Sequence, residues 1–394
     1  MPPFRPSIEP QVLKWARETM FLAPEEAARK IGVQENVLLN WEAGAASPTL
    51  TQLRKVAAVY RHSLATFLLA TPPPESRTVV AFRTLPSTEA ALPSPAFADG
   101  LRRATRQQAV ARHLADLTGD EISPIDFGQR FSENAEKSGH AVREWLGISL
   151  SQQLSWKTIE EAFRSWTRAI ENRDILVIHV ARVELSEMRA FAEQSQPFPV
   201  IGLNGKDAAA GKTFSLLHEL AHILLASEDN PSIHVFRSDA RSVSRDALAE
   251  TFCNQVAAAA LMPAYDLLEQ TSIPVGGEPK TWSDEQIRSL SARYKVSREA
   301  LLLRLVSLGK ADQEFYRLKK QGYDEEYRQR AEAQERESGG GDYYRLKVRD
   351  LGRRFVADVL SAYGNEDISS RDVTRYLGVR LGQLPRLENL VQRH

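Results

Sequence analysis

Apolar residues recur at helical spacing in several short segments of the first 70 residues. In PEEAARKIGV (24–33), a starting proline and three apolar residues on one face predict a short helix that ends at Gly32. A second short helix is expected over 34–42, QENVLLNWE, and two more over 47–69. Short helices on either side of a glycine turn are typical of a helix-turn-helix domain, which we expect over residues 1–70.

The pattern changes from residue 79 onwards, where strand-like and longer helical segments follow one another. FPVIGLN (198–204) is an apolar run of strand length, and TFSLLHELAHILLA (213–226) is apolar over most of its surface. A second apolar helix, AETFCNQVAAAALMP (249–263), ends at a proline. We expect a mixed α and β domain over 79–310 in which both helices are buried.

Proline and glycine mark the boundaries between these parts. TPPPESRT (71–78) is expected to be a stiff, proline-rich linker. Beyond residue 310, a charged helical stretch is interrupted by ESGGGD (337–342), which predicts a hinge. We expect residues 311–394 to form a helical C-terminal module.

The end of this module has a helix-turn-helix character and is rich in arginine. Serine caps and a following glycine predict a short helix within ISSRDVTRYLGV (368–379). The basic residues here are Arg353, Arg354, Arg371, Arg375 and Arg380. We interpret the module as a packing or dimerisation element, with a second nucleic-acid contact as the alternative.

Composition narrows the function classes. The 394 residues include 51 basic and 51 acidic side chains, so no net charge attracts the whole chain to nucleic acid or to an anionic membrane. The single cysteine, Cys253, excludes intramolecular disulfides and cysteine-rich metal sites. The first residues lack the apolar core of a signal peptide, and no run of about 20 apolar residues is present to span a bilayer. We therefore expect a soluble, cytoplasmic protein with no membrane contact.

The sequence HELAH, at 218–222, is the clearest candidate for chemistry. Residues four apart on a helix project side by side, so His218 and His222 can bind one divalent ion. Glu219 lies one residue round the helix, where it can reach a water at the metal and exchange protons as a general base. A core helix with two hydrogen-bonded histidines is the alternative, but two lone imidazoles are costly on so apolar a helix.

A catalytic zinc needs a third protein ligand. We favour Glu250, the single carboxylate on the face of the second apolar helix that is expected to pack against the first. Glu228 and His234, in the segment between the two helices, are the other candidates. Cys253 lies on the same face as Glu250, and we interpret it as a small buried hydrophobic residue rather than a ligand.

The paired motifs TFSLLHELAHILL and AETFCNQVAAAALMP resemble the ImmA/IrrE family of bacterial metallo-endopeptidases, over most of 79–310. The phrases AARKIGV, NWEAG and SPTLTQLRKVAAVY resemble an Xre/Cro-type repressor domain over about 10–70. These resemblances imply an α+β, mainly α protein. Its parts would be an all-α helix-turn-helix domain, a zincin-like metallopeptidase domain with a small β-sheet, and the C-terminal helical module.

The peptidase resemblance also implies roles for individual residues. His218, His222 and Glu250 would bind the metal, and Glu219 would be the catalytic base. The metal would be zinc, with another divalent ion such as Mn²⁺ as the alternative. The substrate would be a regulatory protein, such as a repressor or an antitoxin. VIGLN (200–204) is expected to be an edge strand that pairs with an extended substrate, and Asn204 to shape that strand or to form a turn.

DNA binding by the N-terminal domain would depend on exposed polar residues. We expect base contacts from Gln34, Asn36 and Asn40, and phosphate contacts from Arg29 and Lys30. The alternative is a domain that docks a protein partner or forms a homodimer. For the whole chain, we expect a zinc-dependent endopeptidase. The alternatives are a DNA-binding regulator whose peptidase-like domain senses a metal or a ligand, and a scaffold.

Overall fold

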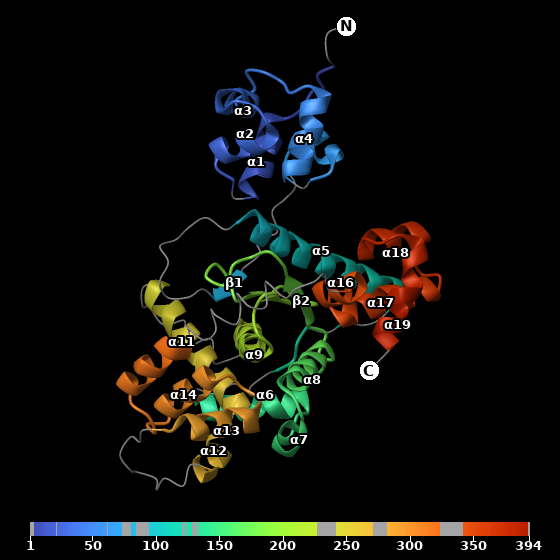
Figure 1. The fold of residues 1–394 in the computed structure, drawn as a ribbon. Helices are drawn as coiled ribbons and strands as arrows, with labels where there is room; N and C mark the ends of the chain where they lie inside the picture. Colours follow the sequence, from blue (N-terminus) through green and yellow to red (C-terminus); the bar gives the residue numbers. More distant parts are fainter. Residues whose placement is uncertain are drawn as a thin grey trace.

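The computed structural model describes most of the chain. The described residues are 4–20, 22–60, 62–72, 80–83, 94–119, 122, 124–127, 132, 134–226, 242–270, 282–323 and 342–392. The fold is α+β and mainly helical, as predicted, with a helical N-terminal unit that is set apart from a larger body (Figure 1). Most of the expected linker (71–78) and most of the expected hinge (337–342) lie outside the described residues.

The N-terminal unit is a set of short helices around a core of its own. Its helices are α1 (Pro10–Glu18), α2 (Pro24–Ile31), α3 (Glu35–Glu42), α4 (Leu50–Tyr60) and a 3₁₀ helix η1 (Leu64–Leu68). Gly32 ends α2 at a φ of 82°, in the left-handed region that glycine adopts without strain. Trp41, Tyr60 and Phe67 are buried in this core, and among the described residues only Ala98 joins it from outside the unit. The helix-turn-helix architecture is therefore present.

The larger body is built around a four-stranded sheet with the order β1-β3-β4-β2. Its strands are β1 (Val80–Arg83), β2 (Leu176–Val180), β3 (Ala190–Glu193) and β4 (Val200–Asn204). Strands β2 and β4 run parallel, whereas β3 pairs antiparallel with both β1 and β4. The expectation that VIGLN is an edge strand is wrong, because β4 lies between β3 and β2 and its two edges are already hydrogen-bonded.

Alternate side chains of the strands serve two separate hydrophobic cores, as the pleat of a β-strand requires. On β2, Val177 belongs to one core, while Leu176 and Ile178 belong to the other. The first core contains α6 (Ala135–Leu146), α7 (Leu150–Ser155), α8 (Ile159–Glu171), α9 (Ala209–Ala226), α11 (Ser242–Leu261), α12 (Ala264–Gln270), α13 (Asp284–Tyr294) and α14 (Arg298–Ser307). The second contains α5 (Pro95–Thr118), α16 (Tyr343–Leu351), α17 (Arg353–Gly364), α18 (Ser370–Leu377) and α19 (Leu384–Gln392).

The C-terminal helices are continuous with the body of the molecule. Side chains of α17 pack with those of α5 and β2 in the second core. Gln107 of α5 donates a hydrogen bond to the Leu351 carbonyl at 3.0 Å. At Gly352 (φ 86°) the backbone approaches β2 so closely that a Cβ would lie 2.4 Å from the Val177 carbonyl oxygen. The helices expected to form the C-terminal module thus form, together with α5, one of the two layers that cover the sheet.

Candidate metal centre

The helix α9 is surrounded by protein. Every residue from Thr213 to Leu225 is buried, since α9 packs against the sheet, α8 and α11 (Figure 1). This burial explains the almost uniformly apolar composition of the helix, and it makes any polar side chain on α9 costly unless it has a specific partner. His218 and Glu219 are fully buried, and His222 is 8% exposed.

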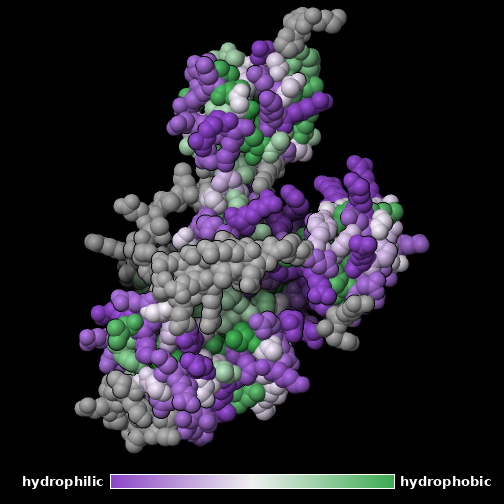
Figure 2. All heavy atoms as spheres, in the orientation of Figure 1, coloured by the Kyte–Doolittle hydropathy of each residue, from purple (hydrophilic) through white to green (hydrophobic). Residues whose placement is uncertain are grey.

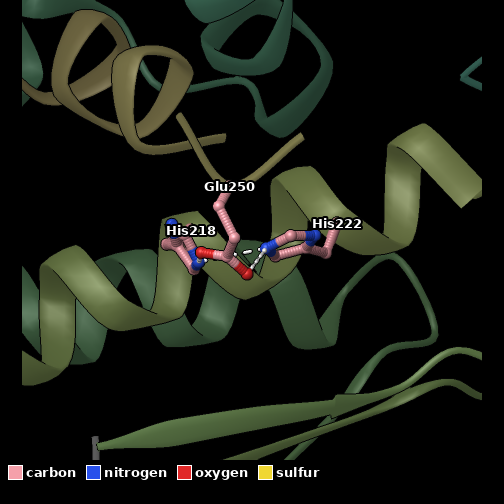
Figure 3. Close-up of side chains that lie close together, drawn as sticks. All are labelled: His218, His222 and Glu250. Atoms are coloured by element: carbon pink, nitrogen blue, oxygen red, sulfur yellow. Dashed lines mark hydrogen bonds and ion pairs between the residues drawn. The ribbon is translucent and has the colours of Figure 1, made fainter. Parts of the chain in front are cut away.

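The side chains of His218, His222 and Glu250 converge on one point (Figure 3). The Nε2 atoms of the two histidines are 3.1 Å apart. The carboxylate of Glu250 reaches down from α11, with one oxygen 3.1 Å from His222 Nε2 and the other 3.3 Å from His218 Nε2. The structure therefore brings together the three residues that the sequence suggested as ligands.

The spacing of these atoms fits a zinc ion. Ligand atoms that hold a tetrahedral zinc at about 2.0–2.1 Å lie about 3.3 Å from one another. The two nitrogens are 3.1 Å apart, and each lies 3.1 or 3.3 Å from its nearer oxygen of the Glu250 carboxylate, so these separations are close to that distance. Two histidine nitrogens and one carboxylate oxygen are also a donor set that zinc prefers in hydrolytic sites.

The site is reached from the side of Glu250. Its side chain is 38% exposed, whereas that of His218 is 0% exposed. Burial alone would raise the pKa of Glu250, but hydrogen bonds and charge interactions with His218 and His222 outweigh burial and hold that pKa well below its usual range. Glu250 is therefore a carboxylate at neutral pH, which is the form that binds a metal.

Glu219 faces the same region as Glu250. Burial raises the pKa of the Cys253 thiol well above its usual value, and the negative charges of Glu250 and Glu219 raise it further. Both carboxylates therefore lie close enough to Cys253 to affect it. With a raised pKa and no exposed surface, Cys253 is a buried thiol of the core, in line with its interpretation from the sequence.

Three polar side chains hold the C-terminal end of α11, the helix that carries Glu250. Arg143 of α6 donates a hydrogen bond to the Ala260 carbonyl at 2.7 Å, Gln153 to the Leu261 carbonyl at 2.9 Å, and Arg304 of α14 to the Met262 carbonyl at 3.1 Å. These groups satisfy carbonyls that have no partner within a helix. Nothing in the sequence indicated that these three residues would contact α11.

Close packing of α6 against α11 supports the same end. A Cβ at Gly139 would lie 2.6 Å from the Ala259 side chain, so only glycine allows this approach. A glycine inside the helix EKSGHAVREW was the one signal in the sequence for this contact. Among the described residues, no other group of three or more His, Cys, Asp or Glu side chains converges in this way.

The remaining candidate residues have different positions. Glu228 and His234 lie outside the described residues, so the structure does not place them. Asn204 is fully buried and forms a turn, in which its side-chain oxygen accepts a hydrogen bond from the backbone amide of Lys206 at 2.9 Å. Its side-chain nitrogen donates hydrogen bonds to the Val183 and Met188 carbonyls.

The proposed DNA contacts lie together on the surface of the N-terminal unit. Gln34, Asn36 and Asn40, at the start of α3 and along it, are exposed, as are Arg29 and Lys30 at the end of α2. Lys30 forms a salt bridge with Glu26 at 2.8 Å on the same helix, which reduces its availability to phosphate. Within the described residues, no helix is both long enough and apolar enough to cross a membrane.

Comparison with known families agrees with this architecture. A family model for the IrrE N-terminal-like domain, Peptidase_M78, matches residues 171–306. This range includes the strands β2, β3 and β4 and the helices α9 and α11. A helix-turn-helix family model, HTH_3, matches residues 13–67. A search of curated proteins finds no match. The chain thus combines a helix-turn-helix domain with an IrrE N-terminal-like peptidase domain, and the ImmA/IrrE resemblance inferred from its sequence is confirmed.

Proposed function

We propose that this protein is a cytoplasmic, zinc-dependent endopeptidase that cleaves a regulatory protein. The observation that carries the proposal is the convergence of His218, His222 and Glu250 at ligand spacing. The match of residues 171–306 to a peptidase family supports the reaction class, because it was found independently of this geometry.

Each residue of the site has a role in the proposal. His218, His222 and Glu250 hold the ion, and the partly exposed side of Glu250 leaves room for water and substrate. A bound zinc supplies Lewis acidity toward a peptide carbonyl and toward water. Glu219 accepts a proton from the attacking water on its carboxylate and then delivers it to the departing amine nitrogen. Because Glu219 is buried beside the ligands, its proton transfer is shielded from bulk solvent.

The domain combination supports the class of substrate in this proposal. A helix-turn-helix domain on the same chain would bring the peptidase to DNA or to a protein that works on DNA. A repressor or an antitoxin would be such a protein, and its cleavage would change gene expression.

A second candidate function is supported by the exposed polar surface of α2 and α3. In this alternative, the protein is a DNA-binding regulator, and the metal centre acts as a sensor without cutting any substrate. Gln34, Asn36 and Asn40 would read base edges, and Arg29 would contact phosphate.

The decisive experiment compares cells that express the native protein, Glu219→Gln or Glu160→Gln. The first change removes the base without removing a metal ligand, while Glu160 is an exposed residue of α8 and serves as the matched control. New protein N-termini are measured by mass spectrometry, with and without stress. We expect one fragment, from a DNA-associated regulator, with the native protein and Glu160→Gln but not with Glu219→Gln.

Metal analysis of the purified variants keeps the outcomes separate. Glu219→Gln should retain zinc, whereas His222→Ala and Glu250→Ala should lose it. If fragments are the same for all variants and zinc is present, the peptidase proposal is wrong. Salt-dependent binding to an operator that is lost in Asn36→Ala/Asn40→Ala, and unaffected by Glu219→Gln, would then support the sensor alternative.

A further inference from the structure

A basic pocket lies in the C-terminal layer, away from the metal centre. It has a volume of about 670 Å³ and is bounded by the start of α16, the exposed side of α18 and the turn that follows α18. Ligand pockets for small molecules have volumes in the same range. The pocket belongs to the layer that forms the second core, whereas α9 and α11 belong to the first (Figure 1).

Three arginines that line this pocket form no salt bridge within the described part of the chain. Arg371, Arg375 and Arg380 are all exposed, and none of them forms a salt bridge with a described residue. Other arginines of the same layer are paired: Arg349 with Asp350 at 2.6 Å, and Arg354 with Asp358 at 2.8 Å. Asp372 lies close enough to Arg371 and Arg375 for their charges to interact, but it forms no salt bridge with either of them, so all three guanidinium groups can still bind an external anion.

The pocket has no described acidic lining residue. The nearest carboxylate in the sequence, Asp372, is occupied as the capping box of α18, where it accepts hydrogen bonds from the Ser369 amide at 3.2 Å and hydroxyl at 2.5 Å. A fourth cation adds to the positive potential, because a Cβ at Gly378 would lie 3.1 Å from Lys347 Nζ. Burial and the nearby Arg103 lower the pKa of Lys347.

An exposed aromatic ring completes the wall. Tyr343 is 53% exposed, and its ring packs edge-on against Tyr344 at a centroid distance of 5.3 Å. Arg386 stacks on the other ring, Tyr344, at 5.0 Å, which helps to fix the pair. The face of Tyr343 is thus held at the pocket, where a flat aromatic group can stack on it.

We propose that this pocket binds a small phosphorylated ligand of the nucleotide type. Arg371, Arg375 and Arg380 would bind its phosphate groups, because guanidinium groups form paired hydrogen bonds with phosphate oxygens. Tyr343 would stack on its base. The pocket is shallow and open to solvent, on a largely hydrophilic lobe (Figure 2), and its arginines come from one short helix and the turn after it, a small area that suits a small anion better than the extended backbone of duplex DNA. The inference does not depend on the proposed peptidase activity.

The test is isothermal titration calorimetry on the full chain at low salt, with ATP, GTP and inorganic pyrophosphate as probes. We expect Arg371→Ala/Arg375→Ala to weaken the binding of each probe by at least about tenfold, since it removes charge-assisted hydrogen bonds. The matched control is Arg345→Ala, on α16 and 74% exposed, which should change affinity less than about twofold. Tyr343→Ala should weaken ATP by about fivefold and leave pyrophosphate unchanged.

Several results would overturn the proposal. One is the absence of binding by all three probes, and another is binding that survives the double substitution, which would place it elsewhere, such as at the zinc. An equal loss in Arg345→Ala would indicate diffuse charge instead of a pocket. Binding of a 20-base-pair duplex but of no nucleotide, lost in the double variant, would show that this surface contacts nucleic acid. Thermal unfolding of each variant by circular dichroism excludes misfolding as the cause.

Discussion

Four α-helices stand near each end of the chain, and the two sets bury their apolar residues in different ways. Helices α1–α4 enclose a core of their own, to which the described part of the rest of the chain contributes only Ala98. Helices α16–α19 have no such independence: Phe355, Val356 and Val359 of α17 share a core with α5 and with the outer face of β2. Both sets contain short helices, glycine turns and exposed arginines, so their sequences look alike.

The difference shows that helical pattern alone does not define a folding unit. A unit folds by itself when its apolar faces cover one another, and it depends on a neighbour when they cover a sheet. The N-terminal set can therefore act as a separate binding domain. The C-terminal set is part of the scaffold on which the metal centre is built.

Truncation gives the largest expected contrast. Removing residues 342–394 exposes the apolar side of β2 and α5, and each large side chain that loses burial costs about 1.5–3 kcal/mol. Since whole domains are stable by only about 5–15 kcal/mol, we expect this chain to be insoluble or unfolded. A chain that begins at residue 73 should instead fold cooperatively and bind zinc. Soluble yield, circular dichroism and zinc content measure both; a folded, zinc-binding 1–341 would contradict the comparison.

Single core substitutions should separate the two sets within the intact chain. Phe355→Ala and Trp41→Ala each remove a side chain that is 2% exposed, with an expected loss of about 3–5 kcal/mol. Phe355→Ala should lower the unfolding temperature of the large body, whereas Trp41→Ala should affect only a separate N-terminal transition. Differential scanning calorimetry resolves the two transitions, and a single transition lowered equally by both changes would show that the sets unfold together.

The pH dependence of stability tests the contact between α8 and the C-terminal layer. Burial raises the pKa of Glu171, at the end of α8, from 4.5 to about 7, although hydrogen bonding and charge from Arg354 partly offset this. Between these two pH values the unfolded chain loses the proton that the folded chain keeps, so stability falls as pH rises from about 4.5 to about 7.

Glu171→Gln should remove that fall and stabilise the protein at pH 8 by about 2–3 kcal/mol, with little change at pH 4.5. Urea unfolding at both pH values measures the effect. Glu160→Gln, an exposed change on the same helix, is the control and should leave both values unaltered. Equal stability of Glu171→Gln and the native protein at pH 8 would contradict the prediction, because it would mean that ionisation of Glu171 does not lower the free energy of unfolding.

The smallest expected effect concerns the contact between the N-terminal unit and α5. Arg102 of α5 donates a hydrogen bond to the Tyr60 carbonyl at 2.8 Å. Arg102→Ala should change the free energy of unfolding by about 1–2 kcal/mol, because Arg102 also lies 3.3 Å from His62 Nε2 and such partly exposed contacts each contribute little. Small-angle X-ray scattering should show a modest increase in the radius of gyration. A large loss of stability in the main transition would show that the two parts are coupled more tightly than the structure indicates.

Local patterns in the sequence predicted much of the site. His218 and His222 are four residues apart on one helix, so their geometry follows from the helix alone. Glu250 was predicted from the single carboxylate on an apolar face, and the structure places it beside both histidines. The helix-turn-helix unit could also be predicted, because its glycine turn and its core are formed by residues close in sequence.

Long-range packing was not predictable in the same way. Arg143 and Ala260 are 117 residues apart, and nothing in either segment indicates the other. The central position of β4 was missed because a short apolar strand reads the same at an edge or in the middle of a sheet. The packing of α17 against α5 and β2 could not be predicted, because a helix's apolar face does not reveal whether it covers a helix or a strand.

The hydrogen bonds at the end of α11 lie far from the metal ligand that this helix carries. Arg143 and Arg304 fix this helix at Ala260 and Met262, while Glu250 sits ten residues earlier, about 15 Å along the axis. At this distance, a tilt of about 5° about Ala260 would move the Glu250 carboxylate by about 1.3 Å. A displacement of that size is enough to break metal coordination or to lower a reaction rate about a hundredfold. The position of Glu250, and with it the metal site, therefore depends on how α11 packs against α6 and α9.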